Sequence, residues 1–504
     1  MSALGLGLQR RRPVGVLRVV LRNAGILSPA VGIMALISIP VALAWGEQDA
    51  VTPLMITAGL SFALSGCLYI PFRRAPESRT GEALITCAVA FLVISLVGAL
   101  PFVLIARNAA SASSTAALRD PANAVFESIS GLSTTGLTMV TSPEDLPRIL
   151  QWWRSFLQWV GGLGIVVFML TLVTGLAPPT ARSLYYTERD ERVSPSIRAS
   201  VRSIGWIYTL YTAVGAGALW ASGLSLWDAS NAAMTALSTG GFASTSRLLT
   251  SGSPAAVQVI LCVLMVAGAT NFAAHYLLLT GRLREFVGNA ATRWLFASFG
   301  ISCALLFLAN TTALSLFDSA RLSIFQAISA STTTGFQSAD IRSWPDLSKL
   351  LLVGAMFVGG AAGSTAGGIK VIRLLLVVQG TRWWIRKMGS SAHAVFPLRV
   401  GREVIPHGDV EERVVAASTL VLLWIALYVL AVLIVLPFVP AGFSLSDVMF
   451  EVMSAQATTG LSTGLTQPSL PLIVKFVLAI CMWLGRIELL PAFVMLRAFA
   501  RRRG

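Results

Sequence analysis

One short motif of hydroxyl residues and a glycine occurs four times in this chain, each time between long apolar stretches. The four copies are Ser133-Thr134-Thr135-Gly136-Leu137, Ser238-Thr239-Gly240-Gly241-Phe242, Ser331-Thr332-Thr333-Thr334-Gly335-Phe336 and Ala457-Thr458-Thr459-Gly460-Leu461. The copies align on one glycine each, which we call the anchor glycine. The match extends toward the N-terminus, because an isoleucine or methionine stands seven residues before each anchor glycine. An internal repeat constrains a fold more than any single local signal. This repeat predicts a short helix followed by an extended loop, four times in one chain.

The residue types in these loops suit a cation. A dehydrated cation needs oxygens on all sides, and backbone carbonyls and threonine hydroxyls supply them without a full negative charge. Glycine lets the backbone turn its carbonyls toward an axis, and the preceding helix directs its negative dipole end the same way. One copy alone would be an ordinary polar turn, but four copies in register favour a cation filter around one axis. The predicted filter residues are Ser133, Thr134, Thr135, Gly136, Ser238, Thr239, Gly240, Gly241, Thr332, Thr333, Thr334, Gly335, Thr458, Thr459, Gly460 and Leu461.

Two details modify the repeat. Gly240 stands where the other loops have threonine, which removes one side-chain oxygen from the predicted ring but no carbonyl. Glu127, Gln326 and Glu451 occupy equivalent positions in three of the short helices. We expect these three to brace the filter from behind, the alternative being purely local hydrogen bonds to loop amides.

The composition places these loops in a membrane protein. Of 504 residues, 55% are hydrophobic and 12% are charged, and the mean hydropathy is +0.74. Apolar stretches near the roughly 20 residues that cross a bilayer predict ten crossings. These are Ala24–Trp45, Val51–Phe72, Glu82–Ile105, Trp152–Leu176, Ile204–Ala221, Ala255–Thr280, Thr292–Leu314, Leu347–Trp384, Val414–Val439 and Pro471–Phe499. The four expected short helices are Pro121–Leu132, Asp228–Leu237, Ser319–Ala330 and Asp447–Gln456.

The predicted fold class is therefore an all-α polytopic membrane protein, with ten transmembrane helices and four re-entrant pore helices. Four repeats of crossing, pore loop and crossing would surround one pore, and two extra helices would precede them. The predicted domains are a two-helix extension over residues 1–79 and pore repeats over residues 80–179, 180–285, 286–390 and 391–504.

The distribution of positive charge predicts the orientation in the membrane. With the N-terminus inside, cytoplasmic segments hold 28 of the 38 Lys and Arg residues and outer segments hold nine. This bias follows the positive-inside rule. It places both termini in the cytoplasm and all four loops on the outer side, as a single filter requires. The net charge of +15 is therefore explained by topology, and no nucleic-acid partner is expected.

A glycine-rich strip interrupts the third repeat. The strip, Gly359-Gly360-Ala361-Ala362-Gly363-Ser364-Thr365-Ala366-Gly367-Gly368, has five glycines in ten residues, and Lys370 follows it closely. Unwound backbone inside a membrane persists only where it is buried in protein or lines water. We predict a broken helix that acts as a gate below the filter. The alternative is close helix packing through small residues. Such packing needs small residues on one face of a helix, whereas in the strip they would cover all faces.

Arg486 lies near the middle of the last expected crossing, with Glu488 two residues on. A charge at that depth is costly unless it meets water or a partner. We predict that Arg486 faces the pore, as an electrostatic barrier or as a partner of the glycine-rich strip. The alternative is an arginine that extends to the inner headgroups. Residues two apart on a helix point to different faces, so Arg486 and Glu488 should not pair.

Enzyme chemistry has little support in the sequence. His275, His393 and His407 lie far apart without metal-ligand spacing. No cluster of nucleophile, base or metal ligand lies within an apolar stretch, so a membrane enzyme is a remote alternative. No directly bound cofactor is expected.

The four loops, the glycine-rich strip through Lys370 and the sequence Gly485-Arg486-Ile487-Glu488 together resemble the Trk/Ktr/HKT superfamily of potassium transporters, and the two leading helices resemble its TrkH branch. The resemblance covers nearly the whole chain. It implies potassium uptake across a bacterial inner membrane, with K⁺ bound at the filter residues named above. It implies a homodimer with one pore per protomer and a cytoplasmic ring of nucleotide-binding regulatory subunits similar to TrkA. It also implies a gate at Gly359, Gly360, Gly363, Gly367, Gly368, Lys370 and Arg486.

Two transport mechanisms remain open at this point. The first is a gated potassium pore driven by the membrane potential. The second is a sodium- or proton-coupled potassium symporter on the same scaffold.

Overall fold

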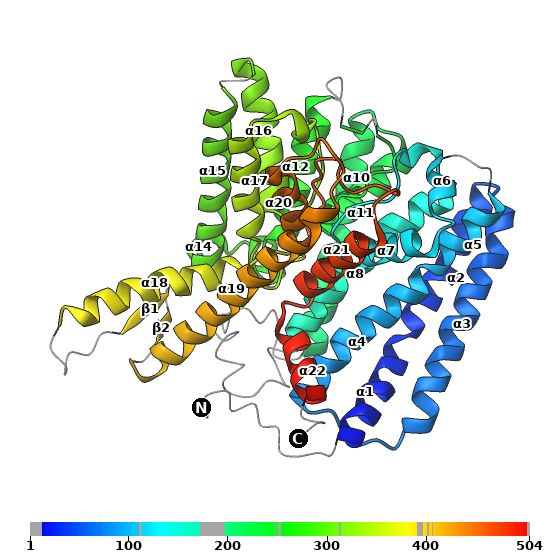
Figure 1. The fold of residues 1–504 in the computed structure, drawn as a ribbon, viewed down its shortest axis with the longest axis horizontal. Coiled ribbons are helices and arrows are strands. Elements are labelled where there is room, and N and C mark those ends of the chain that lie inside the picture. Colours follow the sequence, from blue (N-terminus) through cyan, green and yellow to red (C-terminus); the bar gives the residue numbers. More distant parts are fainter. Residues whose placement is uncertain are drawn as a thin grey trace.

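The computed structural model describes residues 13–109, 113–171, 197–246, 248–249, 254–311, 314–390, 397–400, 403–405 and 407–500. These residues form a mostly helical protein, shown in Figure 1. Three helices, α1 (Pro13–Leu27), α2 (Pro29–Ala44) and α3 (Val51–Tyr69), lie along one side of it. Ser61 joins α3 to the other two, because its hydroxyl donates to Ser28 O at 2.7 Å and accepts from Gly32 N at 2.9 Å. The expected two-helix extension is thus a packed unit of three helical segments.

The remaining helices follow the order that the repeat predicts. The first repeat contains α4 (Thr80–Gly98), α5 (Leu100–Asn108), α6 (Ser113–Ala117), α7 (Pro121–Leu132) and α8 (Arg148–Thr171). The second contains α10 (Ile197–Ala221), α11 (Leu226–Leu237), α12 (Ala255–Ala269) and α13 (Phe272–Leu279). The third contains α14 (Leu283–Gly288), α15 (Ala290–Asn310), α16 (Leu316–Ser331), α17 (Asp346–Phe357) and α18 (Val371–Met388). The fourth contains α19 (His407–Val435), α20 (Leu445–Gln456), α21 (Leu472–Arg486) and α22 (Leu490–Ala500).

Three of the four short helices begin earlier than the sequence predicts. A serine hydroxyl accepts from the backbone N–H of an aspartate three residues later, at Ser225 and Asp228, Ser315 and Asp318, and Ser444 and Asp447. This is the N-terminal half of a capping box, in which the serine precedes the first helical residue. The prediction placed the helix starts at or after the aspartates, which are the third residues of the helices. The remaining short helix, α7, has the predicted bounds.

The helices that return from the four loops arrange the repeats in a circle. Each returning helix packs against the short helix of the next repeat: α8 against α11, α12 against α16, α17 against α20, and α21 against α7. The last contact joins the fourth repeat to the first. The circle is therefore closed, and the four loops meet at its centre.

Three of the returning helices are interrupted. The axes of α12 and α13 differ by 112° at a short break, and the glycine-rich strip separates α17 from α18. The last expected crossing, Pro471–Phe499, is not one helix but two, because Glu488 and Leu489 have left-handed φ values of 59° and 61° between α21 and α22. The bend after α12 and the end of α21 each bond to the glycine-rich strip, and the strip bonds to the loops.

Within the described ranges, five helical segments have the length and hydropathy to cross a membrane, and the bent pair of α12 and α13 could be a sixth. The five are Val14–Ala44, Gln48–Phe72, Gly81–Asn108, Ala290–Asn310 and Asp409–Phe438. The end of the expected crossing Trp152–Leu176 lies outside the described residues. Ten crossings, four membrane-inserted short helices and the domain bounds stay predictions.

An arm projects from the side opposite α1 to α3 in Figure 1. It consists of α18, the start of α19 and a short antiparallel hairpin of β1 (Leu398–Val400) and β2 (Glu403–Ile405). The sequence prediction contained no strand here, because the segment lies between the expected crossings Leu347–Trp384 and Val414–Val439. Leu398, Ile405 and Trp383 belong to one buried cluster, which attaches the hairpin to α18.

Candidate functional site

Each short helix ends in the same backbone turn. In the first loop, the N–H of Thr134 donates to Gly131 O at 3.0 Å and that of Thr135 to Ser130 O at 2.9 Å, and the other loops repeat both bonds. The turn puts Thr134, Thr239, Thr333 and Thr458 in the left-handed conformation, with φ of 54°, 52°, 52° and 52°. Glycine is the usual residue at such a helix end, and an L-residue costs roughly 1–2 kcal/mol more there. Threonine in this conformation at four equivalent positions indicates a functional role for its side chain.

The anchor glycines close the four loops into a ring. They are Gly136, Gly241, Gly335 and Gly460, with φ of 94°, 73°, 92° and 91°. A Cβ on each would overlap one carbonyl oxygen of the neighbouring loop: Gly240 O, Thr334 O, Thr459 O and Thr135 O, in the same order. These contacts run from the first loop to the second, third and fourth and back to the first. The structure thus brings all four predicted loops together, with their carbonyl groups packed against one another.

Several buried oxygens in the ring have no hydrogen-bond partner within the described part of the chain. They include the hydroxyl oxygens of Thr134, Thr458 and Thr459. Buried polar atoms in proteins are nearly always satisfied, so exceptions call for an explanation. A ring of carbonyl and hydroxyl oxygens can provide the coordination shell of a dehydrated cation. The residues present therefore fit a dehydrated cation.

The three residues predicted to brace the filter make local hydrogen bonds to the segments that follow their loops, and their bracing role stays a prediction. Glu127 accepts hydrogen bonds from Thr138 Oγ1 at 2.8 Å and from Met139 N at 2.8 Å, and Arg154 donates to it at 2.7 Å. Glu451 accepts from Ser462 Oγ at 2.8 Å and from Thr466 N at 3.0 Å. Each carboxylate thus ties the chain that leaves a loop to the helix that enters it. Gln326 makes the corresponding contact in the third repeat, to Ser338 Oγ at 3.1 Å.

The predicted break in the third returning helix is also present, and the glycine-rich strip lies against the loops. Gly367 N donates to Thr333 Oγ1 at 2.6 Å, and Gly368 N donates to Ala457 O at 3.0 Å. Thr365 Oγ1 donates to Leu237 O at 3.0 Å and accepts from Thr239 Oγ1 at 3.2 Å. The strip therefore contacts the second, third and fourth loops.

The other face of the strip is attached to the bend between α12 and α13. Asn271 Nδ2 donates to Ala362 O at 2.8 Å, and Phe272 N donates to Gly363 O at 3.2 Å. Gly360 packs closely as well, since a Cβ there would lie 3.0 Å from Ala269 O. At the ends of the strip, Gly359 N donates to Ile369 O at 3.0 Å. The strip is thus held by hydrogen bonds to backbone and side chains rather than by helical structure.

Arg486 is buried, with 4% of its surface exposed, and it contacts the strip. Its two terminal nitrogens donate to Thr365 O at 2.7 Å and to Gly161 O of α8 at 2.8 Å. The side chain therefore links the fourth repeat to the strip and to the first repeat. The alternative of an arginine that extends to the headgroups does not agree with this geometry.

Glu488 forms no ion pair with Arg486 within the described part of the chain, but helical spacing is not the reason, because Glu488 lies in the break between α21 and α22. Its carboxylate pairs instead with Arg373 and lies 3.9 Å from Lys370 Nζ. Lys370 Nζ also donates to Ala366 O at 2.5 Å. These contacts join the C-terminal end of the strip to the break between α21 and α22.

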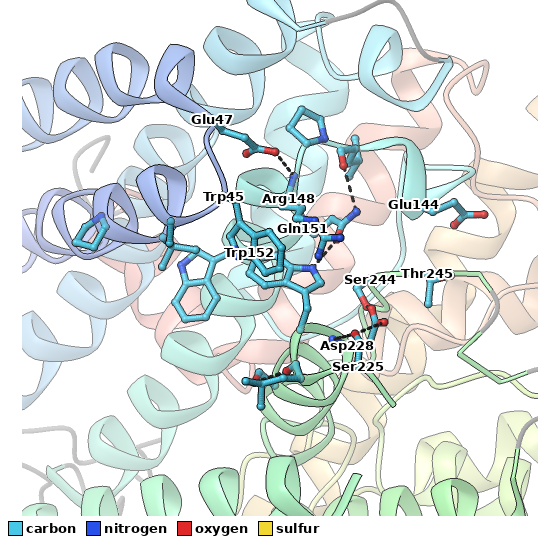
Figure 2. A pocket seen from close by; sticks show the side chains of 18 residues that line it. Trp45, Glu47, Glu144, Arg148, Gln151, Trp152, Ser225, Asp228, Ser244 and Thr245 are labelled. Atoms are coloured by element: carbon cyan, nitrogen blue, oxygen red, sulfur yellow. Dashed lines mark hydrogen bonds between the residues drawn. The ribbon is translucent and has the colours of Figure 1, made fainter. Parts of the chain in front are cut away.

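A separate cavity of about 990 Å³ lies where the N-terminal helices meet the first two repeats (Figure 2). Arg148 lies over the Trp45 ring, with its guanidinium carbon 4.0 Å from the ring centroid, and Glu47 accepts from Arg148 N at 2.7 Å. No residue of the four loops lines this cavity. Its contacts attach the N-terminal unit to the first repeat, and the candidate transport site is the ring.

Sequence reasoning missed two residues of the site, Gln158 and Asn271, and it gave no role to the side chain of Thr365 within the predicted strip. These three residues each bond to backbone that is distant in the chain, with separations of 82, 91 and 128 residues for the bonds to Gly240, Ala362 and Leu237. No local pattern indicates such contacts. His393 lies outside the described residues, and within those residues no group of three His, Cys, Asp or Glu could hold a metal ion.

A closed ring of backbone oxygens inside a helical, membrane-type fold defines a cation-transport protein. The family model described as TrkH, cation transport protein, matches residues 53–500. The chain therefore belongs to the TrkH family of cation transport proteins, and it is a transporter rather than an enzyme.

Known proteins are similar to this chain over nearly its full length. An uncharacterized cation transporter of Methanocaldococcus jannaschii is 31% identical, over 94% of this chain and 94% of that protein. The Trk system potassium uptake protein TrkH of Halomonas elongata is 30% identical, over 95% of this chain and 98% of its own. The crystal structure of the potassium transporter TrkH from Vibrio parahaemolyticus covers 95% of this chain and 98% of that one, with a TM-score of 0.80 at 24% identity. The last comparison confirms the fold.

Proposed function

We propose that this chain takes up potassium ions through the centre of the ring formed by its four loops. The observation that carries the proposal is the closed circle of contacts between anchor glycines and neighbouring carbonyls. Relatives that match nearly the full chain are named potassium uptake proteins. The number and field strength of coordinating carbonyls are among the properties that can favour K⁺ over Na⁺.

The glycine-rich strip is the proposed gate. It occupies the space against three of the loops and takes up the hydroxyl groups of Thr239 and Thr333. Arg486 would hold the strip in this place through Thr365 O. Opening then requires the strip to leave the loops, with loss of the Arg486 bond and of its bonds to the bend after α12.

The setting we propose is a bacterial inner membrane, with the termini in the cytoplasm and the loops outside. The excess of Lys and Arg on the predicted inner segments supports this orientation. Several relatives are named as proteins of a Trk system, which supports a regulatory partner. We propose a homodimer that binds a cytoplasmic ring of nucleotide-binding subunits.

Reversal potentials of the purified protein in planar lipid bilayers test this function. A K⁺ pore predicts a reversal potential that follows the K⁺ gradient and ignores imposed Na⁺ and proton gradients. A shift with either of those gradients that fits a fixed coupling stoichiometry would indicate the symporter instead, whereas a shift that fits a permeability ratio would indicate a less selective pore. Absence of any K⁺-dependent current from correctly assembled protein would refute potassium transport itself.

A further inference from the structure

The second loop differs from the other three at Gly240, and its backbone does not explain the difference. The equivalent residues are Thr135, Thr334 and Thr459. Gly240 is not among the residues with a left-handed backbone, so a side chain would be sterically allowed by its conformation. Something outside the second loop must therefore account for the glycine.

The amide of Gln158, from α8 of the first repeat, occupies the space of the missing side chain. A Cβ at Gly240 would lie 2.5 Å from Gln158 Oε1 and 2.8 Å from its Nε2. Gln158 is fully buried. Its Nε2 donates to Gly240 O at 2.6 Å, and its Oε1 accepts from Phe242 N at 3.0 Å. The two bonds together fix the orientation of the amide, because a reversed amide would place Oε1 against Gly240 O and Nε2 against the N–H of Phe242.

The carbonyl that Gln158 contacts belongs to the ring. Gly240 O is the oxygen that packs against Gly136, the anchor glycine of the first loop. Within the described part of the chain, no side chain donates to the equivalent oxygens of Thr135, Thr334 and Thr459. A carbonyl oxygen has two lone pairs, so Gly240 O can accept from Gln158 and also coordinate an ion.

Two of the other loops are stabilised from within. The hydroxyls of Ser133 and Thr135 are 2.6 Å apart in the first loop, and those of Thr332 and Thr334 are 2.8 Å apart in the third. Gly240 has no hydroxyl with which to form such a pair. In the second loop, the hydrogen bonds with Gln158 of the neighbouring repeat take the place of this internal hydroxyl pair.

Comparison of the repeats suggests that Gln158 and Gly240 occur together, in place of a methionine and a threonine at the equivalent positions. Gly161, Gly268 and Gly485 each pack against the last carbonyl of their own short helix. The residues three positions before them are Gln158, Met265 and Met482, all fully buried. Around the circle, the helix that carries each of these residues packs against the short helix of the next repeat. Met265 and Met482 are followed by the loops with Thr334 and Thr135, whereas Gln158 is followed by the loop with Gly240.

We infer that Gln158 is a positioning residue for ion selectivity, which holds the Gly240 carbonyl at the distance that suits potassium. The inference rests on the proposed function. Without the amide, Gly240 O can move toward a smaller ion, and the ring would then accept sodium more readily. Loss of the neutral hydrogen bond from Gln158 to Gly240 O should lower the permeability ratio of K⁺ to Na⁺ by about threefold to tenfold.

The test compares the parent with Q158M, G240T and the double variant Q158M/G240T, by reversal potentials in planar bilayers and by yield of folded protein in size-exclusion chromatography. The matched control is Q151M. Gln151 is a buried amide on the same helix. It donates to Pro143 O and Leu146 O and accepts from Trp227 Nε1 at the start of α11, and none of these partners belongs to the four loops. Q151M should lower stability but leave the permeability ratio unchanged.

We expect Q158M to lower the ratio and G240T to lower folded yield or flux, because its side chain overlaps Gln158. The double variant should recover a ratio within twofold of the parent, because it reproduces the methionine and threonine of the other repeats. If Q158M folds with the parental ratio, or if the double variant is no better than G240T, the inference is overturned. A parent without K⁺-selective current would instead refute the proposed function itself.

Discussion

Replacement of Arg486 by alanine should release the glycine-rich strip and increase potassium flux. Arg486 donates to Thr365 O of the strip at 2.7 Å and to Gly161 O at 2.8 Å. Only the first of these bonds must break when the strip leaves the loops, because Gly161 belongs to α8. The Thr365 bond therefore sets the contribution of Arg486 to the equilibrium between the closed and open gate.

The size of the effect follows from that one bond. A hydrogen bond from a charged group contributes about 1.5–3 kcal/mol, and every 1.4 kcal/mol corresponds to a factor of about ten in an equilibrium constant. Arg486→Ala should therefore raise the open fraction by about 10- to 150-fold. Flux should rise by the same factor until the open state predominates.

Radioactive rubidium uptake into proteoliposomes without the regulatory partner measures this change. Arg486→Lys separates two explanations, because lysine keeps the charge but lacks the planar fork that bonds two carbonyls at once. Fast flux in both variants supports a latch, whereas fast flux only with alanine supports an electrostatic barrier. Arg282→Ala is the control for loss of one positive charge, since its side chain is 62% exposed. Parental flux in both Arg486 variants would refute a role in gating.

Three further predictions concern the filter, the strip and the brace. Replacement of Gly136 by serine should raise Na⁺ permeability relative to K⁺, because its φ of 94° and the Gly240 carbonyl leave no room for a side chain; unchanged permeability ratios in this variant and in the serine variants of Gly335 and Gly460 would remove the filter assignment. Deletion of Gly360–Gly367 should leave selectivity intact, raise flux and uncouple it from the partner; low, regulated flux in a folded deletion would mean that the strip only packs. Glu451→Gln should lower the thermal stability and K⁺ selectivity of the detergent-purified protein, because a neutral amide cannot accept all the bonds from Ser462, Thr463 and Thr466; parental values for both would show that the brace is dispensable.

The parts of the site that could be predicted are those with a signal along the chain. The four loops share residue types at fixed positions, and the glycine density of the strip indicates a broken helix without reference to any partner. Glu127 and Glu451 were recognisable for the same reason, because they occupy one position in two repeats. In each case the information lies within a short segment or its internal copies.

The parts that could not be predicted depend on contacts across the circle. Nothing in the sequence near Gln158 indicates that its amide reaches Gly240, 82 residues away. Pro491, just after the break that follows Arg486, cannot donate to the carbonyl of Ile487 and is a local signal for a break. The left-handed residues of the break are Glu488 and Leu489, whose conformation a sequence pattern would reject. The ion pair of Glu488 with Arg373 accompanies this conformation, and that pairing is visible only in three dimensions.

The central claim is that the four loops coordinate a monovalent cation on the axis of their ring. Anomalous diffraction from crystals grown in thallium or rubidium tests it most directly, because both ions substitute for potassium and are visible by their scattering. The account predicts anomalous density on the axis between the carbonyl oxygens of Thr135, Gly240, Thr334 and Thr459. Density elsewhere in the protein, with none between these oxygens, would contradict it.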